Sequence, residues 1–274
     1  MGRLAGKVAL VTGGTSGIGR RIVEFYVREG AQVVFSGRRE SEGRAVAEAT
    51  SARFVRADVT REDDCRASVQ AALDAHGRLD ILVNNAGGPA LSSRLEAIDL
   101  ADFRGMLDLH ILGALAHIKH AAPAMRAQRS GSIVNVGSVA GHRAGYSATI
   151  AYSVAKAGVI HMTRCAAMEL GEDGIRVNCI SPGAIATGIF AKSLGMSSDK
   201  ADATAEKVKD RIATLQAIPR AGLTDDIASA ALFLASDESG FINGEDMVID
   251  GGMIWGRRYS EANAGGSTWK RLFD

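Results

Sequence analysis

Residues 8–19 read VALVTGGTSGIG, a short apolar strand that runs directly into a glycine-rich turn. A helical pattern over residues 18–28 begins inside that turn. Glycines let the backbone turn tightly and approach a ligand, and the free N–H groups at a helix N-terminus favour an anion. The turn therefore predicts a pyrophosphate site, although its TGxxxGxG spacing is not the usual GxGxxG fingerprint and the glycines could serve turn geometry alone.

The same alternation of strand and helix continues along the chain. We expect strands at residues 8–11, 33–35, 54–55, 81–83, 133–136, 175–180 and 247–249. Helix-length segments lie between them, at residues 18–28, 62–76, 101–126, 152–170 and 225–235. Strands that alternate with helices form a parallel sheet covered on both faces. The sequence thus predicts a single-domain α/β fold, a Rossmann-type doubly wound parallel sheet of about seven strands with helices on both faces.

The strand–helix rhythm is interrupted once and ends before the C-terminus. Residues 187–219 show mixed helix and loop character, and we expect them to form a substrate lid. The dinucleotide-binding and catalytic domain is expected to span residues 1–252, followed by a C-terminal tail, residues 253–274. That tail contains both tryptophans, Trp255 and Trp269. Large rings gain nothing in a free tail, so we expect it to dock on its own or a neighbouring subunit, a solvated tail being the alternative.

Composition excludes several classes of protein. The 274 residues carry 32 Lys and Arg against 31 Asp and Glu, so no basic surface for nucleic acid is expected. Three separated cysteines form no CxxC pair, which argues against a disulfide framework or a zinc site. Neither a secretory signal nor an apolar run long enough for a bilayer is visible. We therefore expect a cytoplasmic protein that binds neither nucleic acid nor membrane.

Several short motifs stand at the ends of the expected strands. In chain order they are TGGTSGIG at 12–19, Asp58-Val59, NNAG at 84–87, Ser138, YSVAK at 152–156, and Pro182-Gly183 with Thr187. Each motif is common by itself, but the set in this order resembles the short-chain dehydrogenase/reductase family. The resemblance covers nearly the whole chain, from Leu4 to Gly252.

The resemblance implies a nicotinamide dinucleotide bound beyond the carboxyl ends of the strands, where strand order reverses. It places Gly13, Gly17 and Gly19 along the pyrophosphate, Asp58 and Val59 at the adenine, Asn85 and Gly87 at the ribose, and Thr187 at the nicotinamide amide. Asp58 has an alternative role as a surface or capping carboxylate. The expected cofactor contacts are Thr12, Gly13, Thr15, Ser16, Gly17, Ile18, Gly19, Arg38, Arg39, Asp58, Val59, Asn85, Ala86, Gly87, Tyr152, Lys156, Pro182, Gly183, Ile185 and Thr187.

The choice between NADP(H) and NAD(H) depends on the end of the second strand. An NAD enzyme needs an acidic side chain there for the adenosine ribose, and this chain has Gly37 instead. Arg38 and Arg39 follow, and guanidinium groups bind phosphate bidentately. We therefore expect NADP(H). NAD(H) is the alternative if these arginines merely begin the next helix and Glu40 neutralises one of them.

Tyr152 and Lys156 are four residues apart and hence on the same face of the expected helix. A free tyrosine has a pKa of about 10, and a fixed ammonium nearby favours the phenolate. The resemblance implies that Tyr152 donates or accepts the proton, that Lys156 also binds the nicotinamide ribose, and that Ser138 holds the substrate oxygen. A YxxxK pair alone is weak, but Ser138 precedes Tyr152 by fourteen residues, a separation common in the family.

His110 occupies the position where the family has the asparagine of its catalytic set, in the stretch LHILG at 109–113. The resemblance implies a locally opened helix whose backbone carbonyl holds a water that leads to the lysine, a role that does not strictly need the amide. An imidazole that joins the proton relay is the alternative. His117 and His120 lie at helical spacing from His110, but no carboxylate or cysteine completes a set, so no metal is expected.

The expected activity is hydride transfer between NADP(H) and a secondary alcohol or ketone. The alternative, a catalytically silent dinucleotide-binding regulator, would not need Ser138, Tyr152 and Lys156. The enoyl-reductase subgroup is disfavoured because its tyrosine and lysine are farther apart. Apolar residues around the expected lid favour a hydrophobic, alicyclic or aromatic substrate, unless they only pack the lid onto the core. The expected substrate contacts are His142, Ile189 and Phe190, with Leu194, Met196, Ala140 and Pro89 nearby.

The two longest expected helices carry more apolar residues than one buried face needs. These residues include Leu107, Ile111, Leu115, Ile160 and Met162. The family commonly pairs these helices between subunits, so the resemblance implies a homotetramer.

Overall fold

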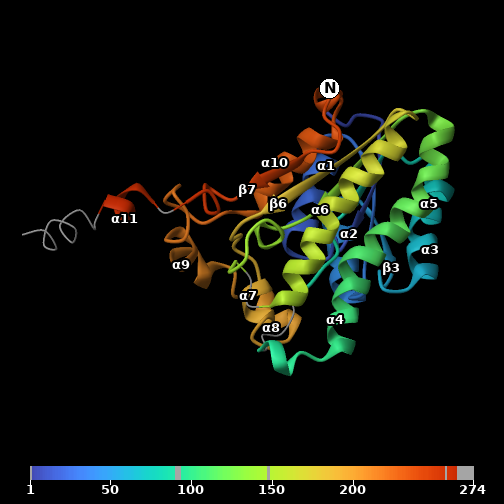
Figure 1. The fold of residues 1–274 in the computed structure, drawn as a ribbon. Helices are drawn as coiled ribbons and strands as arrows, with labels where there is room; N and C mark the ends of the chain where they lie inside the picture. The colour runs from blue at the N-terminus through green and yellow to red at the C-terminus, as the bar shows by residue number, and fades with distance from the viewer. Residues whose placement is uncertain (1, 90–93, 147–148, 257, 264–274) are drawn as a thin grey trace, which may run out of the picture.

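Seven parallel strands form one sheet in a computed structural model that describes residues 2–89, 94–146, 149–256 and 258–263 (Figure 1). The strand order is β3-β2-β1-β4-β5-β6-β7. The strands are β1 (Val8–Thr12), β2 (Gln32–Gly37), β3 (Arg53–Arg56), β4 (Ile81–Asn84), β5 (Gly131–Val136), β6 (Ile175–Pro182) and β7 (Asp246–Ile249). The predicted doubly wound sheet is therefore confirmed, and strand order reverses between β1 and β4.

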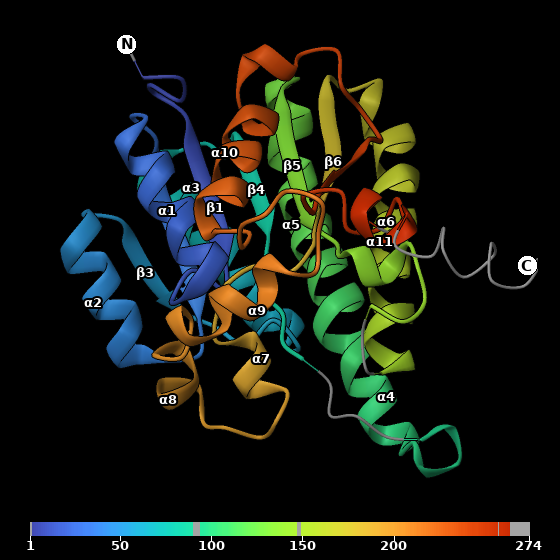
Figure 2. The same cartoon turned by 90° about the vertical axis from the view of Figure 1, so that its left-hand side faces the viewer.

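The sheet lies between two layers of helices, which Figures 1 and 2 show from two sides. One layer contains α1 (Gly17–Arg28), α2 (Glu40–Thr50) and α10 (Thr224–Ala235), and the other contains α3 (Glu62–His76), α5 (Gly113–Gln128) and α6 (Ile150–Gly171). The shorter helices are α4 (Leu100–Leu107), α7 (Ile189–Lys192), α8 (Ser198–Asp202), α9 (Lys209–Ala213) and α11 (Tyr259–Asn263). The expected helices are confirmed, while α2 was not among them.

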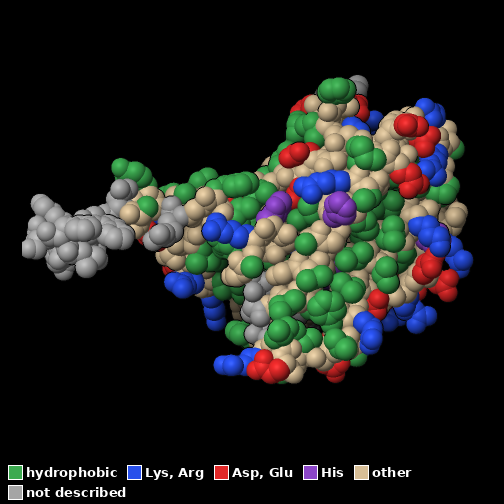
Figure 3. All heavy atoms as spheres, viewed as in Figure 1, with side chains coloured by type: hydrophobic (Ala, Val, Ile, Leu, Met, Phe, Trp, Pro, Cys, Tyr) green, Lys and Arg blue, Asp and Glu red, His purple; other side chains and the backbone are tan. Residues whose placement is uncertain are grey.

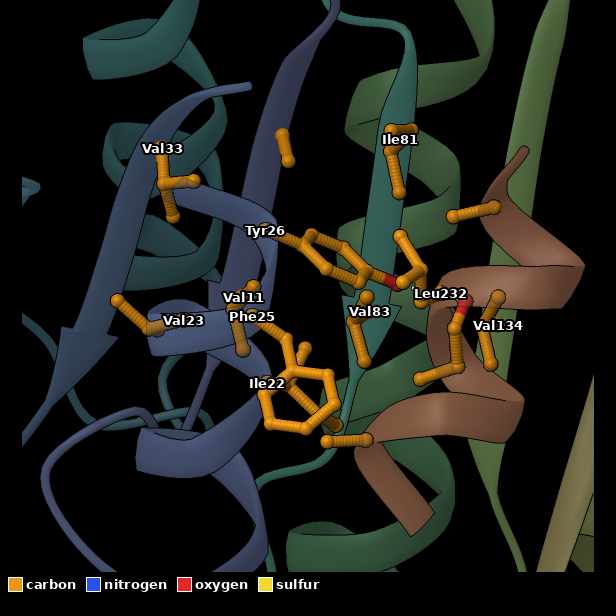
Figure 4. Packing of buried hydrophobic residues seen from close by; sticks show 14 of the residues in the cluster. Val11, Ile22, Val23, Phe25, Tyr26, Val33, Ile81, Val83, Val134 and Leu232 are labelled. Atoms are coloured by element: carbon orange, nitrogen blue, oxygen red, sulfur yellow. Dashed lines mark hydrogen bonds between the residues drawn. The ribbon is translucent and has the colours of Figure 1, made fainter. Parts of the chain in front are cut away.

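One half of the core lies between α1, α10 and the sheet, as Figure 4 shows. Tyr26 of α1 is fully buried there, and its hydroxyl donates a 2.9 Å hydrogen bond to the Ala231 carbonyl of α10. Val11 and Val83 bring β1 and β4 into the same cluster. Each fully buried side chain of this size contributes about 1.5–3 kcal/mol to the free energy of unfolding. This packing holds β1 and β4, between which strand order reverses, firmly in the sheet.

The expected long helix at 101–126 is continuous but is opened in its middle. Between α4 and α5 the residues Asp108–Leu112 form a π-helical turn, which leaves backbone carbonyls without their usual i+4 donors. His110 stands in the middle of this turn. The local opening that the family resemblance implied is therefore present.

The insertion after β6 contains α7, α8 and α9, and no residue that the structure describes between 187 and 219 belongs to a strand. Phe190 packs against a small apolar cluster formed by Ala184, Ala186, Ile212 and Ala221. This cluster attaches the insertion to the end of β6. Part of its apolar surface therefore serves packing, the alternative that the sequence left open.

The C-terminal tail leaves the body of the molecule, as the position of α11 in Figure 1 shows. Its start is attached by the Tyr146 hydroxyl, which donates to the Met253 carbonyl at 2.8 Å. Trp255 is 76% exposed, so the described part of the tail does not dock its ring on this subunit. Trp269 lies outside the described residues. Among the helices that the structure describes, none has the length and apolar character to cross a membrane.

Candidate active site

The glycine-rich turn forms a cradle at the N-terminus of α1. Gly13 and Gly17 have φ values of 68° and 55°, in the left-handed region that favours glycine. A Cβ on Gly19 would lie 2.2 Å from the Gly13 carbonyl oxygen, so a side chain has no room there. The Ser16 side chain makes no capping bond to α1, which leaves the first N–H groups of the helix directed at the cradle. These features fit a cofactor phosphate.

Asn85 ties the ends of β1 and β4 together beneath the cradle. Its Nδ2 donates to the carbonyls of Thr12 and Gly13 at 2.9 and 3.3 Å. The Thr12 hydroxyl oxygen accepts from the backbone N–H groups of Asn85 and Ala86, both at 3.0 Å. The Asn85 amide therefore shapes the turn, whereas the resemblance placed this residue at the ribose.

Arg39 is the guanidinium that reaches the cradle. Its Nη2 donates to the Ser16 hydroxyl at 2.7 Å and lies 3.4 Å from the Thr15 hydroxyl. Arg38 instead is 71% exposed and lies 3.9 Å from the Asp58 carboxylate. Burial raises the pKa of Asp58, but hydrogen bonds from Thr60 and the charge of Arg38 leave it below its usual value. Asp58 thus stays ionised, at the expected adenine end beside the buried Val59.

The segment after β6 runs from β7 to the start of α1. The Gly183 N–H donates to the Ile249 carbonyl at 2.9 Å, which continues the pairing with β7 beyond Pro182. Ile185 forms an isolated bridge with Gly222. Thr187 lies against the start of α1, because a Cβ on Gly17 would be 3.6 Å from its methyl carbon. Of the expected set after β6, Thr187 therefore lies beside the phosphate cradle.

Tyr152 and Ser138 are brought together at the start of α6. Ser138 follows β5, and Thr149 caps α6 by accepting a 3.1 Å hydrogen bond from the Tyr152 N–H. Burial raises the pKa of Tyr152, and a hydrogen bond between its hydroxyl and Ser138 lowers it, with a net rise. This direction is opposite to the expected one, because burial outweighs the stabilisation of the phenolate by neighbouring groups.

Lys156 lies one turn along α6, with its ammonium buried. Its Nζ donates to the Val136 carbonyl at 2.7 Å and lies 5.7 Å from the centre of the Tyr152 ring. The residue is 5% exposed, and burial lowers its pKa from 10.5 to about 8. The ammonium is therefore still the dominant form at neutral pH, within reach of the tyrosine.

His110 packs edge-on against Tyr152, with ring centres 5.4 Å apart and planes at 90°. Its Nε2 lies 3.0 Å from the Gly88 carbonyl oxygen, so Nε2 carries the hydrogen, and Nδ1 is buried with no hydrogen-bond partner in the described chain. A Cβ on Gly87 would lie 2.6 Å from the ring, so glycine makes room for the imidazole. Burial and the charge of Lys156 lower the pKa of His110 to about 3. The ring is neutral at physiological pH.

Three other histidines, His117, His120 and His142, each have a separate partner. His117 Nδ1 lies 2.7 Å from the Gly113 carbonyl, and His120 Nε2 lies 3.1 Å from Glu62. Within the described ranges, no three His, Cys, Asp or Glu side chains are grouped to hold a metal ion. His142 Nε2 lies 2.5 Å from the Asp246 carboxylate, so this nitrogen is engaged with β7. The sequence pattern did not reveal Asp246, which stands far along the chain.

Known proteins resemble this chain over nearly its whole length. A family model described as enoyl-(acyl carrier protein) reductase matches residues 13–254. A borneol dehydrogenase of Lavandula x intermedia, named as mitochondrial, is 36% identical and aligns over 92% of each chain. L-fucose dehydrogenase of Bos taurus is 38% identical over 95% of this chain and 94% of its own. The crystal structure of levodione reductase has a TM-score of 0.79 at 31% identity, over 90% of this chain and 97% of that one.

Proposed function

The chain belongs to the short-chain dehydrogenase/reductase family, and from this premise we propose that it is an NADP(H)-dependent oxidoreductase that interconverts a secondary alcohol and a ketone. One observation carries the proposal. The Tyr152 hydroxyl is hydrogen-bonded to Ser138 and lies one helical turn from the buried ammonium of Lys156. The same chain has a glycine cradle that fits a dinucleotide phosphate.

The roles of the side chains follow from their chemistry. A bound nicotinamide cofactor supplies the hydride donor or acceptor. Ser138 and Tyr152 hold the substrate oxygen by hydrogen bonds, and Tyr152 gives its hydroxyl proton to that oxygen in ketone reduction or takes it back in alcohol oxidation. The raised pKa of Tyr152 keeps the hydroxyl protonated and suits the donor role. The Lys156 ammonium stabilises the phenolate left behind.

We propose a hydrophobic, alicyclic or aromatic substrate beneath a lid formed by residues 187–219. The names of two relatives, borneol dehydrogenase and levodione reductase, support this class, whereas L-fucose dehydrogenase points to a sugar. Leu194 and Met196 of the insertion are 87% and 42% exposed, so they offer apolar surface beyond what packing uses. The test is a panel of cyclic terpenoid, aromatic and sugar alcohols and ketones, followed by nicotinamide absorbance with both cofactors.

The competing function is a dinucleotide-binding regulator without turnover. Tight cofactor binding with no turnover across the panel would favour it. An enoyl reductase, which the description of the family model names, is disfavoured by the four-residue spacing of Tyr152 and Lys156. Reduction of an enoyl thioester but of no ketone would reverse that choice.

NADPH is expected to bind more tightly than NADH because of Arg39. Replacing Arg39 with glutamine should weaken NADPH binding by about tenfold or more, since charge-assisted bonds to phosphate are strong, and should leave NADH within about twofold. Titration of nicotinamide fluorescence measures both. Arg44→Gln is the matched control, because this arginine of α2 is exposed, pairs with Glu40 and is not among the expected cofactor contacts. Equal losses for the two cofactors would contradict a phosphate contact.

Installing an acidic residue at Gly37 needs a companion change. A Cβ there would lie 2.6 Å from the Thr15 methyl carbon, so Gly37→Asp alone is crowded. Thr15→Ser removes that methyl group. We therefore expect the Thr15→Ser, Gly37→Asp double variant to favour NADH relative to Thr15→Ser alone.

We propose that His110 acts mainly through its backbone in the π-helical turn. Because the imidazole is neutral, His110→Asn is expected to keep kcat within about tenfold and to leave the pH–rate profile unchanged. A shift of the acidic limb of that profile, with a larger loss in His110→Ala than in His110→Asn, would instead place the ring in the proton relay.

We propose a homotetramer in the cytoplasm. Of the apolar residues expected for this pairing, Ile160 is buried and Ile111 packs against its cluster, whereas Leu115 is exposed. Leu115 of α5, Leu112 of the preceding π-helical turn, and Ile150 and Val154 of α6 are 45–52% exposed. Figure 3 shows apolar side chains distributed over the same side of the molecule. Burial of this face between copies would remove apolar surface from water. Native mass spectrometry tests the assembly, and deletion after Gly252 tests whether the tail contributes to it.

A further inference from the structure

Asp202, the last residue of α8, places a carboxylate from the insertion next to the cradle. Its Oδ2 accepts from Arg39 Nη1 at 2.9 Å, and its Oδ1 accepts from Lys192 Nζ at 2.7 Å. Burial raises the pKa of Asp202, but the hydrogen bonds from Lys192 and Arg39 lower it by more. The pKa is therefore below its usual value, and the carboxylate is ionised. Two cations from different segments thus share one anion.

Close packing fixes the position of this carboxylate. A Cβ on Gly188 would lie 2.6 Å from Asp202 Oδ1 and 2.7 Å from the Ala201 carbonyl carbon. Ala201 is completely buried, so the end of α8 rests on the segment that leaves β6. The packed backbone of the insertion therefore positions the Asp202 carboxylate beside Arg39, and the ion pair does not depend on two flexible surface side chains.

Arg39 is shared between the cradle and the insertion. Nη2 is directed at Ser16 in the phosphate-binding turn, while Nη1 faces Asp202 and lies 3.4 Å from Glu42. A guanidinium binds a phosphate best through two parallel N–H groups, and carboxylates compete for the same N–H groups. A 2′-phosphate that binds at this arginine therefore meets a negative charge already in place.

We propose that Asp202 is a cofactor-specificity residue whose carboxylate competes with the 2′-phosphate of NADP(H) for Arg39, and that Lys192 moderates this competition by sharing the carboxylate. The proposal rests on the proposed function, since it presumes that a nicotinamide dinucleotide lies along the cradle. Its consequence is that the insertion, and not only the end of β2, sets the ratio of NADPH to NADH affinity.

The experiment measures dissociation constants of NADPH and NADH by nicotinamide fluorescence for the full chain and two variants. Asp202→Asn keeps the shape and removes the charge, so NADPH affinity should rise by about fivefold while NADH affinity stays within about twofold. Lys192→Met leaves Asp202 to Arg39 alone, so NADPH affinity should fall by about threefold. If the cluster served only to hold the fold, both substitutions would change NADPH affinity in the same direction.

Asp210→Asn is the matched control, because Asp210 is an exposed carboxylate of α9 in the same insertion. It should leave the affinity ratio unchanged. The proposal is overturned if Asp202→Asn leaves the ratio within twofold of the parent, or if it weakens NADH more than NADPH, which would make Asp202 a ribose ligand. The parent ratio tests the proposed NADP(H) preference separately, because the change of ratio is expected whichever cofactor the parent prefers.

Discussion

Replacing Tyr152 with phenylalanine is expected to lower kcat by about two orders of magnitude or more, with cofactor affinity retained within about twofold. The substitution removes the hydroxyl and keeps the ring that packs against His110. The reacting oxygen then loses its proton donor, and Ser138 loses its hydrogen-bonded partner. Initial rates with the best substrate of the panel, together with fluorescence titration of the cofactor, measure the two effects.

Tyr146→Phe is the matched control for that substitution. Tyr146 also carries a hydrogen-bonded hydroxyl, but its partner is the Met253 carbonyl at the start of the tail. Loss of this bond should leave kcat within about twofold. Unchanged turnover in Tyr152→Phe would reject the acid–base assignment, and equal losses in the two tyrosine variants would point to a general disturbance of the fold.

The strands and the motifs at their ends were predictable because both depend on local sequence. Runs of β-branched residues mark the buried strands, and the glycines of the TGxxxGxG turn are required by the positive φ values at Gly13 and Gly17. Helix α2 was missed because most of its surface is polar. Its contact with β3 depends on Gly43, where a Cβ would lie 2.3 Å from the Phe54 ring.

Side-chain partners that are distant in sequence were not predictable. Arg38 and Arg39 are equivalent by sequence, and the direction of the chain at the end of β2 decides that Arg39 reaches Ser16. His142 pairs with the Asp246 carboxylate, and Arg39 pairs with the Asp202 carboxylate. Each pair joins segments that come together only in the folded sheet, so no local pattern reports it.

The environment of a titratable group is equally invisible to local sequence. The spacing of Tyr152 and Lys156 predicted that the two groups are neighbours, and this is confirmed. The extent of burial was not predictable, and burial raises the pKa of the tyrosine and lowers that of the lysine. Only the lysine shift is a cost to folding at neutral pH, because burial disfavours the ammonium that predominates there, whereas the tyrosine is uncharged in both the folded and the unfolded state.

Replacing Lys156 with methionine is therefore expected to impair turnover strongly and to stabilise the fold. Turnover should fall by about two orders of magnitude or more, because we propose that the ammonium stabilises the phenolate, and cofactor affinity should fall as well if Lys156 binds the nicotinamide ribose as the resemblance implies. The lowering of the lysine pKa from 10.5 to about 8 corresponds to a burial cost of about 3 kcal/mol at neutral pH. Loss of the hydrogen bond to the Val136 carbonyl offsets about 1 kcal/mol of this.

The net gain in the free energy of unfolding should be about 1–2 kcal/mol at pH 7. Between about pH 8 and 10.5 the unfolded parent binds more protons than the folded parent, so parent stability rises with pH and the advantage of the methionine variant shrinks. Urea denaturation at pH 7 and pH 10 measures both effects. Lys119→Met, at an exposed lysine paired with Glu62, is the control and should change stability by less than about 0.5 kcal/mol at either pH. A Lys156→Met variant that is less stable than the parent at both pH values would show that the buried ammonium supports the fold.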